Sequence, residues 1–322
     1  MNMDRRRFLQ TAVAGGAMAT GFRSYAEPAF PSRPITMVVA YSPGGGTDTL
    51  TRALSKPLAK ALGQSVVVEN KAGASEIIAS EYVAGAKPDG YTLLVCSVPH
   101  VTNPSLRTLP YDTVNDFSAV CLAAQSPFVL VVKPDSPIKS LADLVTIAKT
   151  RKLSFASSGI GTADHMSTEL FCYITGISMT HVPYKGTGPG LVDLMGGHVD
   201  IYFANIVGAA PLVKSGKLRA IAVTTEKRSS LLPELPTVQE FTKKPFDVSA
   251  WTGILAPAGT PDNVLNTLSK SINSSLRDDS VTSVMATYGA EIVANSPAEF
   301  RRFINNEVNK WAEVIKATNI KV

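Results

Sequence analysis

Short apolar runs alternate with segments of helical spacing along most of the chain. The runs are too short to be helices and are continuously apolar, which is typical of strands buried on both faces of a sheet. They predict strands at 35–41, 66–68, 92–96, 129–132, 153–156, 179–182, 201–203 and 219–223. Helices fit between most of these strands, so the pattern indicates an α/β protein.

The C-terminal part of the chain has mainly helical patterns. Ser296 and Glu299 stand three residues apart, as in a capping box, and predict that a helix begins there. Apolar side chains then recur with a period of about 3.6 residues, at Phe300, Phe303, Ile304, Val308, Trp311 and Ile315. This face is expected to pack against the core.

Two glycine-rich loops each follow a predicted strand and precede a predicted helix. The first reads YSPGGGTD and covers 41–48, and the second reads SSGIGT and covers 157–162. A helix N-terminus offers unpaired N–H donors and a partial positive charge, and glycines let an anion approach the backbone. Two similar domains that face each other would grip a carboxylate between these loops, although either loop alone could be a tight turn with a helix cap.

The chain lacks the common sequence motifs of nucleotide-binding and catalytic sites. The sequence contains no phosphate loop, dinucleotide fingerprint, nucleophile elbow or HExxH motif. We therefore expect no cofactor, no metal and no catalytic group. Asp48 is interpreted as a helix-terminus residue or as a cleft group that binds an amine. His165 could be a ligand-binding, basic or packing residue, and Lys185 could be a cleft cation or a solvated loop residue.

Composition and charge fit a folded chain without a nucleic-acid partner. The 322 residues are 45% hydrophobic and 18% charged, which permits two domains with real cores. Residues 1–26 hold four of the 31 basic residues and one of the 26 acidic residues. The remaining 27 basic and 25 acidic residues form no basic stripe with interleaved aromatic residues.

The first 26 residues are typical of an export signal. Arg5 and Arg6 in DRRRFLQ match the twin-arginine motif, a mild apolar run follows, and Ser24-Tyr25-Ala26 has the small-x-small pattern of a cleavage site. These features predict removal of the signal near Ala26 and a location in the periplasm. The alternative is a frayed basic N-terminus. The rest of the chain has no apolar run of about 18 residues that predicts a membrane span.

The three cysteines are expected to be buried thiols. Cys96 and Cys172 lie in apolar runs, Cys121 is the third, and no CxxC pair occurs. An odd number of cysteines without close spacing does not indicate a disulfide framework. We therefore interpret all three as small apolar core residues, with a single bridge as the alternative.

Taken together, these segments resemble one known family over nearly the whole mature chain, the Bug family. Its members are periplasmic solute-binding proteins, the substrate-binding component of tripartite tricarboxylate transporters. The matching segments are YSPGGGTD, VVVENKAGA, KPDGYTLL, TNPSLRTLPYDTVNDFSAV, LSFASSGIGTADHMSTELF, HVPYKGTGPGLVDLMGGHVDIYF, SGKLRAIAVTTEKRSSLLPELPTVQEF and WTGILAPAGTP.

The resemblance implies a two-domain type II periplasmic binding protein, with a Venus-flytrap fold and a ligand cleft between its domains. Domain 1 would comprise 27–126 and 250–322, and domain 2 would comprise 127–249. The chain would cross between them near 124–129 and near 247–253. A monomer is expected, because a receptor that closes on its hinge needs no second copy.

The resemblance also implies a set of ligand-binding residues. The first loop would contribute Tyr41, Ser42, Gly44, Gly45, Gly46, Thr47 and Asp48, and the second Ser157, Ser158, Gly159, Gly161 and Thr162. Specificity would come from the rest of the cleft, with Ala74, Ser75, Glu76, His100, Ala204 and Asn205.

Glu76 stands in a segment where the family usually has glycines. One hypothesis is that its carboxylate faces the cleft, repels a second anionic group and favours a ligand with a neutral or cationic end. The alternative is that Glu76 faces solvent and only caps the following helix.

Three functions follow from these observations. The first is a receptor that delivers a small carboxylate to membrane transporter subunits, and the second is a receptor that signals to a sensor kinase. The third is an exported enzyme, which the absence of a nucleophile–base pair disfavours. The sequence leaves amino acids, dicarboxylates, aromatic acids and nicotinate-like acids open as ligands.

Overall fold

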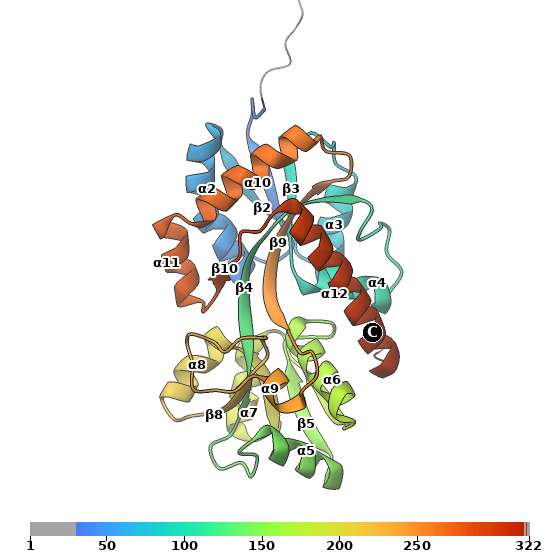
Figure 1. The fold of residues 1–322 in the computed structure, drawn as a ribbon, viewed down its shortest axis with the longest axis vertical. Helices are drawn as coiled ribbons and strands as arrows, with labels where there is room; N and C mark the ends of the chain where they lie inside the picture. Colours follow the sequence, from blue (N-terminus) through green and yellow to red (C-terminus); the bar gives the residue numbers. More distant parts are fainter. Residues whose placement is uncertain (1–29, 319, 321–322) are drawn as a thin grey trace, which may run out of the picture.

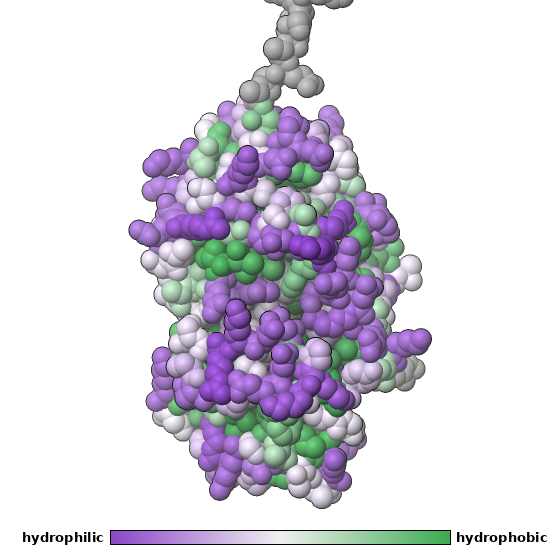
Figure 2. Space-filling model, viewed as in Figure 1, coloured by the Kyte–Doolittle hydropathy of each residue, from purple (hydrophilic) through white to green (hydrophobic). Residues whose placement is uncertain are grey.

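The computed structural model describes residues 30–318 and residue 320, so the predicted export signal lies outside the described residues. The described chain forms two lobes, one above the other in Figure 1. Strands from both lobes join in one sheet with the order β2-β1-β3-β9-β4-β7-β5-β6. Figure 2 shows that polar side chains cover most of one face of the molecule, with separate apolar patches on both lobes.

The upper lobe is built on parallel strands that the apolar pattern predicted. These are β1 (Ile35–Val39), β2 (Val66–Asn70) and β3 (Thr92–Cys96), with β1 in the middle. The strand β9 (Ser249–Pro257) runs antiparallel to β3, and the short β10 (Glu291–Ile292) pairs with β4. Its helices are α2 (Gly46–Leu62), α3 (Ile77–Ala84), α4 (Val98–Leu106), α10 (Asp262–Leu276), α11 (Asp279–Thr287) and α12 (Pro297–Thr318).

The lower lobe repeats the same alternation of strands and helices. Its strands are β5 (Leu153–Ser157), β6 (Met179–Pro183), β7 (Ile201–Asn205) and β8 (Arg219–Val223). The strand β5 runs parallel to β6 and β7. Its helices are α5 (Leu141–Thr150), α6 (Ala163–Thr175), α7 (Thr187–Gly196), α8 (Ile206–Lys214) and α9 (Val238–Thr242).

One long strand, β4 (Phe117–Val132), belongs to both lobes. It pairs with β9 from Phe117 to Pro127 and with β7 and β8 from Phe128 onward. The two strands β4 and β9 therefore run side by side from the upper lobe towards the lower lobe (Figure 1). Nearly every residue of β4 is buried, as expected for a strand covered on both faces.

The predicted strands are confirmed with small changes at their ends, but two predictions were incomplete. The strand expected at 129–132 is only the end of β4, and β9 was not predicted. Alanines, Gln125 and Pro127 give the first part of β4 a weak intrinsic preference for a strand. In β9, a Cβ atom on Gly253 would lie 2.2 Å from the Phe300 ring, so a glycine that weakens the strand pattern makes room for α12.

The helical C-terminus and the cysteines match their predictions. The Ser296 Oγ accepts the Glu299 N–H at 3.3 Å, and the Glu299 carboxylate accepts the Ser296 N–H at 2.9 Å, which completes the capping box of α12. The predicted apolar face of α12 packs in the core, with Phe300, Ile304, Trp311 and Ile315 buried. All three cysteines are free and buried.

Candidate ligand-binding cleft

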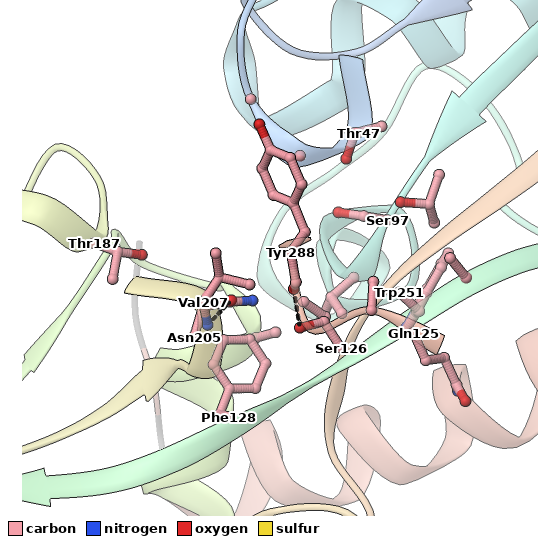
Figure 3. A pocket seen from close by; sticks show the side chains of 18 of the residues that line it. Thr47, Ser97, Gln125, Ser126, Phe128, Thr187, Asn205, Val207, Trp251 and Tyr288 are labelled. Carbon is pink, nitrogen blue, oxygen red and sulfur yellow. Dashed lines mark hydrogen bonds between the residues drawn. The ribbon is translucent and has the colours of Figure 1, made fainter. Parts of the chain in front are cut away.

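A cavity of about 430 Å³ lies where the two lobes meet. Figure 3 shows its lining residues, with Thr47 and Ser97 from the upper lobe and Thr187, Asn205 and Val207 from the lower lobe. Residues of β4 and β9 form the wall that connects them. This volume is typical of a site for a small organic ligand.

The N-termini of five helices converge on this cavity. Each of β1, β3, β5, β6 and β7 leads into a helix, and the residues at those five junctions line the space. They are Gly45, Gly46 and Thr47 of α2, Ser97, Val98 and Pro99 of α4, Thr162, Ala163 and Asp164 of α6, Thr187 of α7, and Asn205, Val207 and Gly208 of α8. Because helix N-termini carry partial positive charge and free N–H groups, this arrangement favours an anionic ligand group.

Asp48 holds the first glycine loop in shape. Its carboxylate accepts hydrogen bonds from the Gly44 N–H at 2.9 Å, from Arg52 Nε at 2.9 Å and from Asn70 Nδ2 at 2.8 Å. Burial alone would raise the pKa of Asp48, but the hydrogen bonds from Arg52, Gly44 and Asn70 lower it to about 2. Asp48 does not line the cavity. The structure therefore favours its interpretation as a helix-terminus residue over an amine-binding one.

Asp164 holds the second loop in the same way. Its carboxylate accepts the Ser158 N–H at 2.7 Å, the Thr162 hydroxyl at 2.5 Å and the Tyr202 hydroxyl at 2.7 Å. Sequence reasoning missed this residue. The order Gly-Thr-Ala-Asp in the second loop resembles Gly-Thr-Asp in the first, and that signal could have found it.

A pair of stacked histidines lies beneath the second loop. The rings of His165 and His181 are 3.9 Å apart between centroids. His165 Nδ1 accepts the Gly161 N–H at 3.1 Å, and His181 Nε2 lies 2.5 Å from the Ser157 hydroxyl. Burial lowers the pKa of His165 to about 3, with a further contribution from His181, and burial lowers the pKa of His181 to about 4. His165 does not line the cavity, which favours the packing interpretation over a ligand-binding one.

Neither orientation expected for Glu76 is found, because its carboxylate neither reaches solvent nor lines the cavity. The side chain is 1% exposed and accepts hydrogen bonds from the Tyr41 hydroxyl, from the Ser97 N–H at 3.0 Å and from the Ser97 hydroxyl at 2.8 Å. Burial raises the pKa of Glu76 to about 7, although these hydrogen bonds oppose the shift. Ala74, Ser75 and Glu76 all have positive φ, the left-handed conformation that glycine adopts more readily. That backbone turns the carboxylate inward, behind the two cavity residues Tyr41 and Ser97.

The structure brings some of the sequence-predicted site residues to the cavity and leaves others behind it. Those that line it are Tyr41, Gly45, Gly46, Thr47, Ser158, Thr162 and Asn205. Those that do not are Ser42, Gly44, Asp48, Ala74, Ser75, Glu76, His100, Ser157, Gly159, Gly161 and Ala204. Several of the second group shape the loops, as described above.

His100 is a core residue rather than a cleft residue. It is fully buried, its Nε2 lies 3.1 Å from the Thr113 carbonyl oxygen, and its ring packs edge-on against Phe117 at 5.0 Å. Burial lowers the pKa of His100 to about 4. The cavity instead receives Ser97, Val98 and Pro99 from the start of the same helix. The strand-to-helix junction after Cys96 was the sequence signal for these residues.

Other cavity residues had no such signal. Gln125, Ser126 and Phe128 come from β4, and Tyr288 follows α11. Figure 3 shows the Ser126 hydroxyl beside the backbone of Tyr288, where it donates to the carbonyl oxygen at 3.4 Å. The lining contains no lysine, arginine or histidine, and Lys185 is an exposed residue outside it. Within the described ranges, no group of three or more His, Cys, Asp and Glu side chains could hold a metal ion.

Two lobes joined by long strands, with helix N-termini facing a shared cleft, define a bilobal small-molecule receptor. A model of the family described as "Tripartite tricarboxylate transporter family receptor" matches residues 50–320. The chain is 37% identical over 331 residues to Protein BugT of Bordetella pertussis, covering 100% of both proteins. The chain belongs to this family, the Bug family of solute-binding proteins, as the resemblance indicated.

Solved structures confirm the two-domain periplasmic binding fold. One is Rpa4515 of R. palustris with adipate, with 37% identity, a TM-score of 0.78 and coverage of 91% of this chain and 99% of that one. Another is MatC (Rpa3494) from Rhodopseudomonas palustris with bound malate, with 32% identity, a TM-score of 0.75 and coverage of 89% and 100%. In the part of this chain that the structure describes, no helix has both the length and the apolar character of a membrane span.

Proposed function

We propose that this chain captures a small carboxylate between its two glycine loops and delivers it to a tripartite tricarboxylate-type transporter. The observation that carries the proposal is the position of α2 and α6, whose N-termini line one cavity from opposite lobes. Gly45, Gly46 and Thr47 face it from one side, and Ser158 and Thr162 from the other. Backbone N–H groups and hydroxyls at two helix N-termini bind a carboxylate without a cationic side chain.

Ligand capture in this proposal closes the two lobes around a hinge in β4 and β9. The domains are 27–126 with 250–322, and 127–249. In support, β4 changes partners from β9 to β7 and β8 between Pro127 and Phe128, and β9 begins at Ser249. Closure buries the ligand, and the membrane subunits then recognise the closed form.

In this proposal, the protein acts in the periplasm as a monomeric receptor and not as an enzyme. The twin-arginine pattern at Arg5 and Arg6 supports export. The family and the adipate and malate complexes described above support solute binding. Asp164 and Glu76 each accept hydrogen bonds from several protein donors. Carboxyl groups held in this way are less available as a catalytic base, which supports a binding role over an enzymatic one.

The test is a thermal-shift screen of residues 27–322, after unfolding and refolding to remove any carried ligand. Carboxylic acids are compared with the primary amides of the same acids. A ligand at 100 times its dissociation constant contributes about 2.7 kcal/mol, which raises the melting temperature by several degrees. We expect shifts with acids that disappear with their amides. Equal shifts with an acid and its amide would contradict the proposal.

A further inference from the structure

Glu76 binds two residues of the cavity wall through their hydroxyl groups. The Tyr41 hydroxyl donates to the Glu76 carboxylate, and the Ser97 hydroxyl donates to the same oxygen at 2.8 Å. The two hydroxyl oxygens lie 2.6 Å apart, which is also a hydrogen-bond distance. Tyr41 and Ser97 are partly exposed and line the cavity, where Figure 3 labels Ser97, whereas Glu76 is buried behind them. These three residues are called the Glu76 cluster below.

The number of hydrogens in the Glu76 cluster decides what it offers to a ligand. Its three groups make three mutual contacts, and each hydroxyl of Tyr41 and Ser97 carries one hydrogen. With Glu76 ionised, two hydrogens serve these contacts, and with Glu76 protonated, three do. Because burial raises the pKa of Glu76 to about 7, both forms occur at neutral pH. Neither form leaves a hydroxyl hydrogen over, so Tyr41 and Ser97 present acceptor lone pairs to the cavity.

The backbone at the start of α4 also has few donors left for a ligand. The Ser97 N–H donates to the two carboxylate oxygens of Glu76 at 3.0 and 3.1 Å, and the His100 N–H donates to the Ser97 carbonyl oxygen at 3.0 Å. Pro99 has no N–H. Of the first three residues of α4, only Val98 therefore keeps an N–H for a ligand. The other four helix N-termini at the cavity are unaffected, so the number of ligand carboxylates is not restricted.

The Glu76 cluster is held in position from behind. The Asn103 side chain of α4 donates from Nδ2 to the Ser75 carbonyl oxygen at 2.6 Å, and Asn103 and Glu76 are each 1% exposed. The turn that carries Glu76 is thus tied to the helix that begins after Ser97. Such buried, mutually bonded polar groups keep their orientation when a ligand arrives.

On this basis we propose that Glu76 is a positioning residue that makes Tyr41 and Ser97 hydrogen-bond acceptors, so that the cleft selects carboxylates that also carry an O–H or N–H donor. Tyr41 begins the first glycine loop, so this donor lies near the carboxylate that the loop binds. A ligand without a donor leaves the acceptors unpaired when the cleft closes, which weakens its binding. The inference rests on the proposed carboxylate-binding function and narrows it to a ligand class.

The test compares acids that differ at one substituent. Succinate has no donor, malate has a hydroxyl, aspartate has an ammonium group, and 2-fluorosuccinate has a polar substituent of similar size without a donor. Propionate, lactate, alanine and 2-fluoropropionate repeat the comparison on a shorter acid. Dissociation constants are measured by titration calorimetry on refolded residues 27–322 at neutral pH. We expect the hydroxy or the amino acid of a series to bind about tenfold more tightly than the two acids without a donor.

The outcomes separate this inference from the function on which it rests. A preference for malate over aspartate assigns a hydroxyl donor, and the reverse assigns an amino group; both support the inference. Succinate or 2-fluorosuccinate that binds as tightly as malate and aspartate would overturn the inference and leave carboxylate capture intact. If no acid of either series binds, the inference fails, and the broader comparison of acids with their amides still decides the carboxylate function.

Variants test whether Glu76 is the source of the preference. Glu76→Gln keeps the volume but brings two amide hydrogens, so four hydrogens serve three contacts and one hydroxyl hydrogen turns to the cavity. We expect the ratio of the succinate and malate dissociation constants to fall severalfold. Glu69→Gln is the control, because that side chain is 42% exposed on β2 and pairs with Lys71, and we expect the ratio to stay unchanged.

A second substitution keeps the test decisive if Glu76→Gln does not fold. Ser97→Ala removes one acceptor and leaves the carboxyl group of Glu76 in place, and we expect it too to reduce the preference for malate over succinate. A loss of affinity that is equal for both acids would indicate a purely structural role. A ratio that neither variant changes, in protein that still melts cooperatively, would overturn the role assigned to the Glu76 cluster.

Discussion

At the residue scale, polar side chains behind the binding loops hold the loop backbone in place. Asp48 and Asp164 accept N–H groups from the loops that precede them, and His165 accepts the Gly161 N–H. Each acceptor satisfies a backbone donor that the glycine-rich turn would otherwise leave unpaired. The loops can therefore present their remaining donors to a ligand in a defined shape.

The stacked histidines make one prediction about stability and pH. The pKa of His165 falls from an ordinary 6.5 to about 3 in the folded chain, so the unfolded chain binds a proton there first as the pH falls. Stability from this group is complete above pH 6.5 and is lost progressively between pH 6.5 and 3. At pH 5 the loss amounts to about 2 kcal/mol.

The measurement is urea unfolding of the native chain and of His165→Gln at pH 7 and pH 5. We expect the variant to be less stable at pH 7, and the difference in unfolding free energy to shrink by about 2 kcal/mol at pH 5. His198→Gln serves as a control at a histidine outside the stacked pair. A difference for His165→Gln that stays constant with pH would contradict the assigned neutral state of His165.

At the element scale, the repeated unit is a strand, a turn and a helix whose N-terminus faces the cleft. Five such units place their junctions around one cavity, because parallel strands end at the same edge of a sheet. The second loop contains Gly161 at φ 78°, where a Cβ atom would lie 2.9 Å from Leu106. Another residue there would have to adopt a strained backbone angle and displace the end of the Leu106 side chain.

The two ends of α6 offer a matched test of this loop. Gly161→Ala and Gly176→Ala both place alanine at positive φ, but only Gly161 lies in the cleft loop, and Gly176 has open space around it. Each should cost about 1–2 kcal/mol of stability. In calorimetric titrations with malate, we expect weaker binding for Gly161→Ala and unchanged binding for Gly176→Ala. Equal affinities for the two variants would contradict a binding role for the second loop.

At the scale of the whole molecule, the lobes are connected by strands and bridged by α12. The long β4 continues from one lobe into the other, and the Tyr173 hydroxyl of α6 donates to Glu313 of α12 at 3.1 Å. Buried apolar side chains of both helices, among them Phe171 and Trp311, belong to the same core cluster. The hinge closure proposed above would bend the strands that connect the lobes without unfolding either lobe.

Closure predicts a change of shape on ligand binding. Small-angle X-ray scattering of residues 27–322 should show a smaller radius of gyration with saturating malate than without ligand. The diamide of malate at the same concentration provides the control for solvent effects. Identical scattering with and without a ligand that is shown to bind would contradict hinge closure.

The sequence by itself determined the α/β alternation, the two glycine loops and the helical C-terminus, because these depend on residues close together in the chain. The period of apolar residues in α12 and the capping box at Ser296 are local patterns of this kind. The loops were recognisable because glycines, small hydroxyl residues and a helix start follow each other directly. The family resemblance extended these patterns to a bilobal fold.

Only the tertiary structure decided which side chains reach the cleft. Glu76 and His100 carry polar groups that the sequence placed in the site, yet both are buried behind its wall. Tyr288 reaches the first turn of α2 from 239 residues away, where its hydroxyl lies 3.3 Å from that of Thr49. Such contacts depend on how lobes, strands and helices pack, and packing direction is not encoded in the local pattern of one segment.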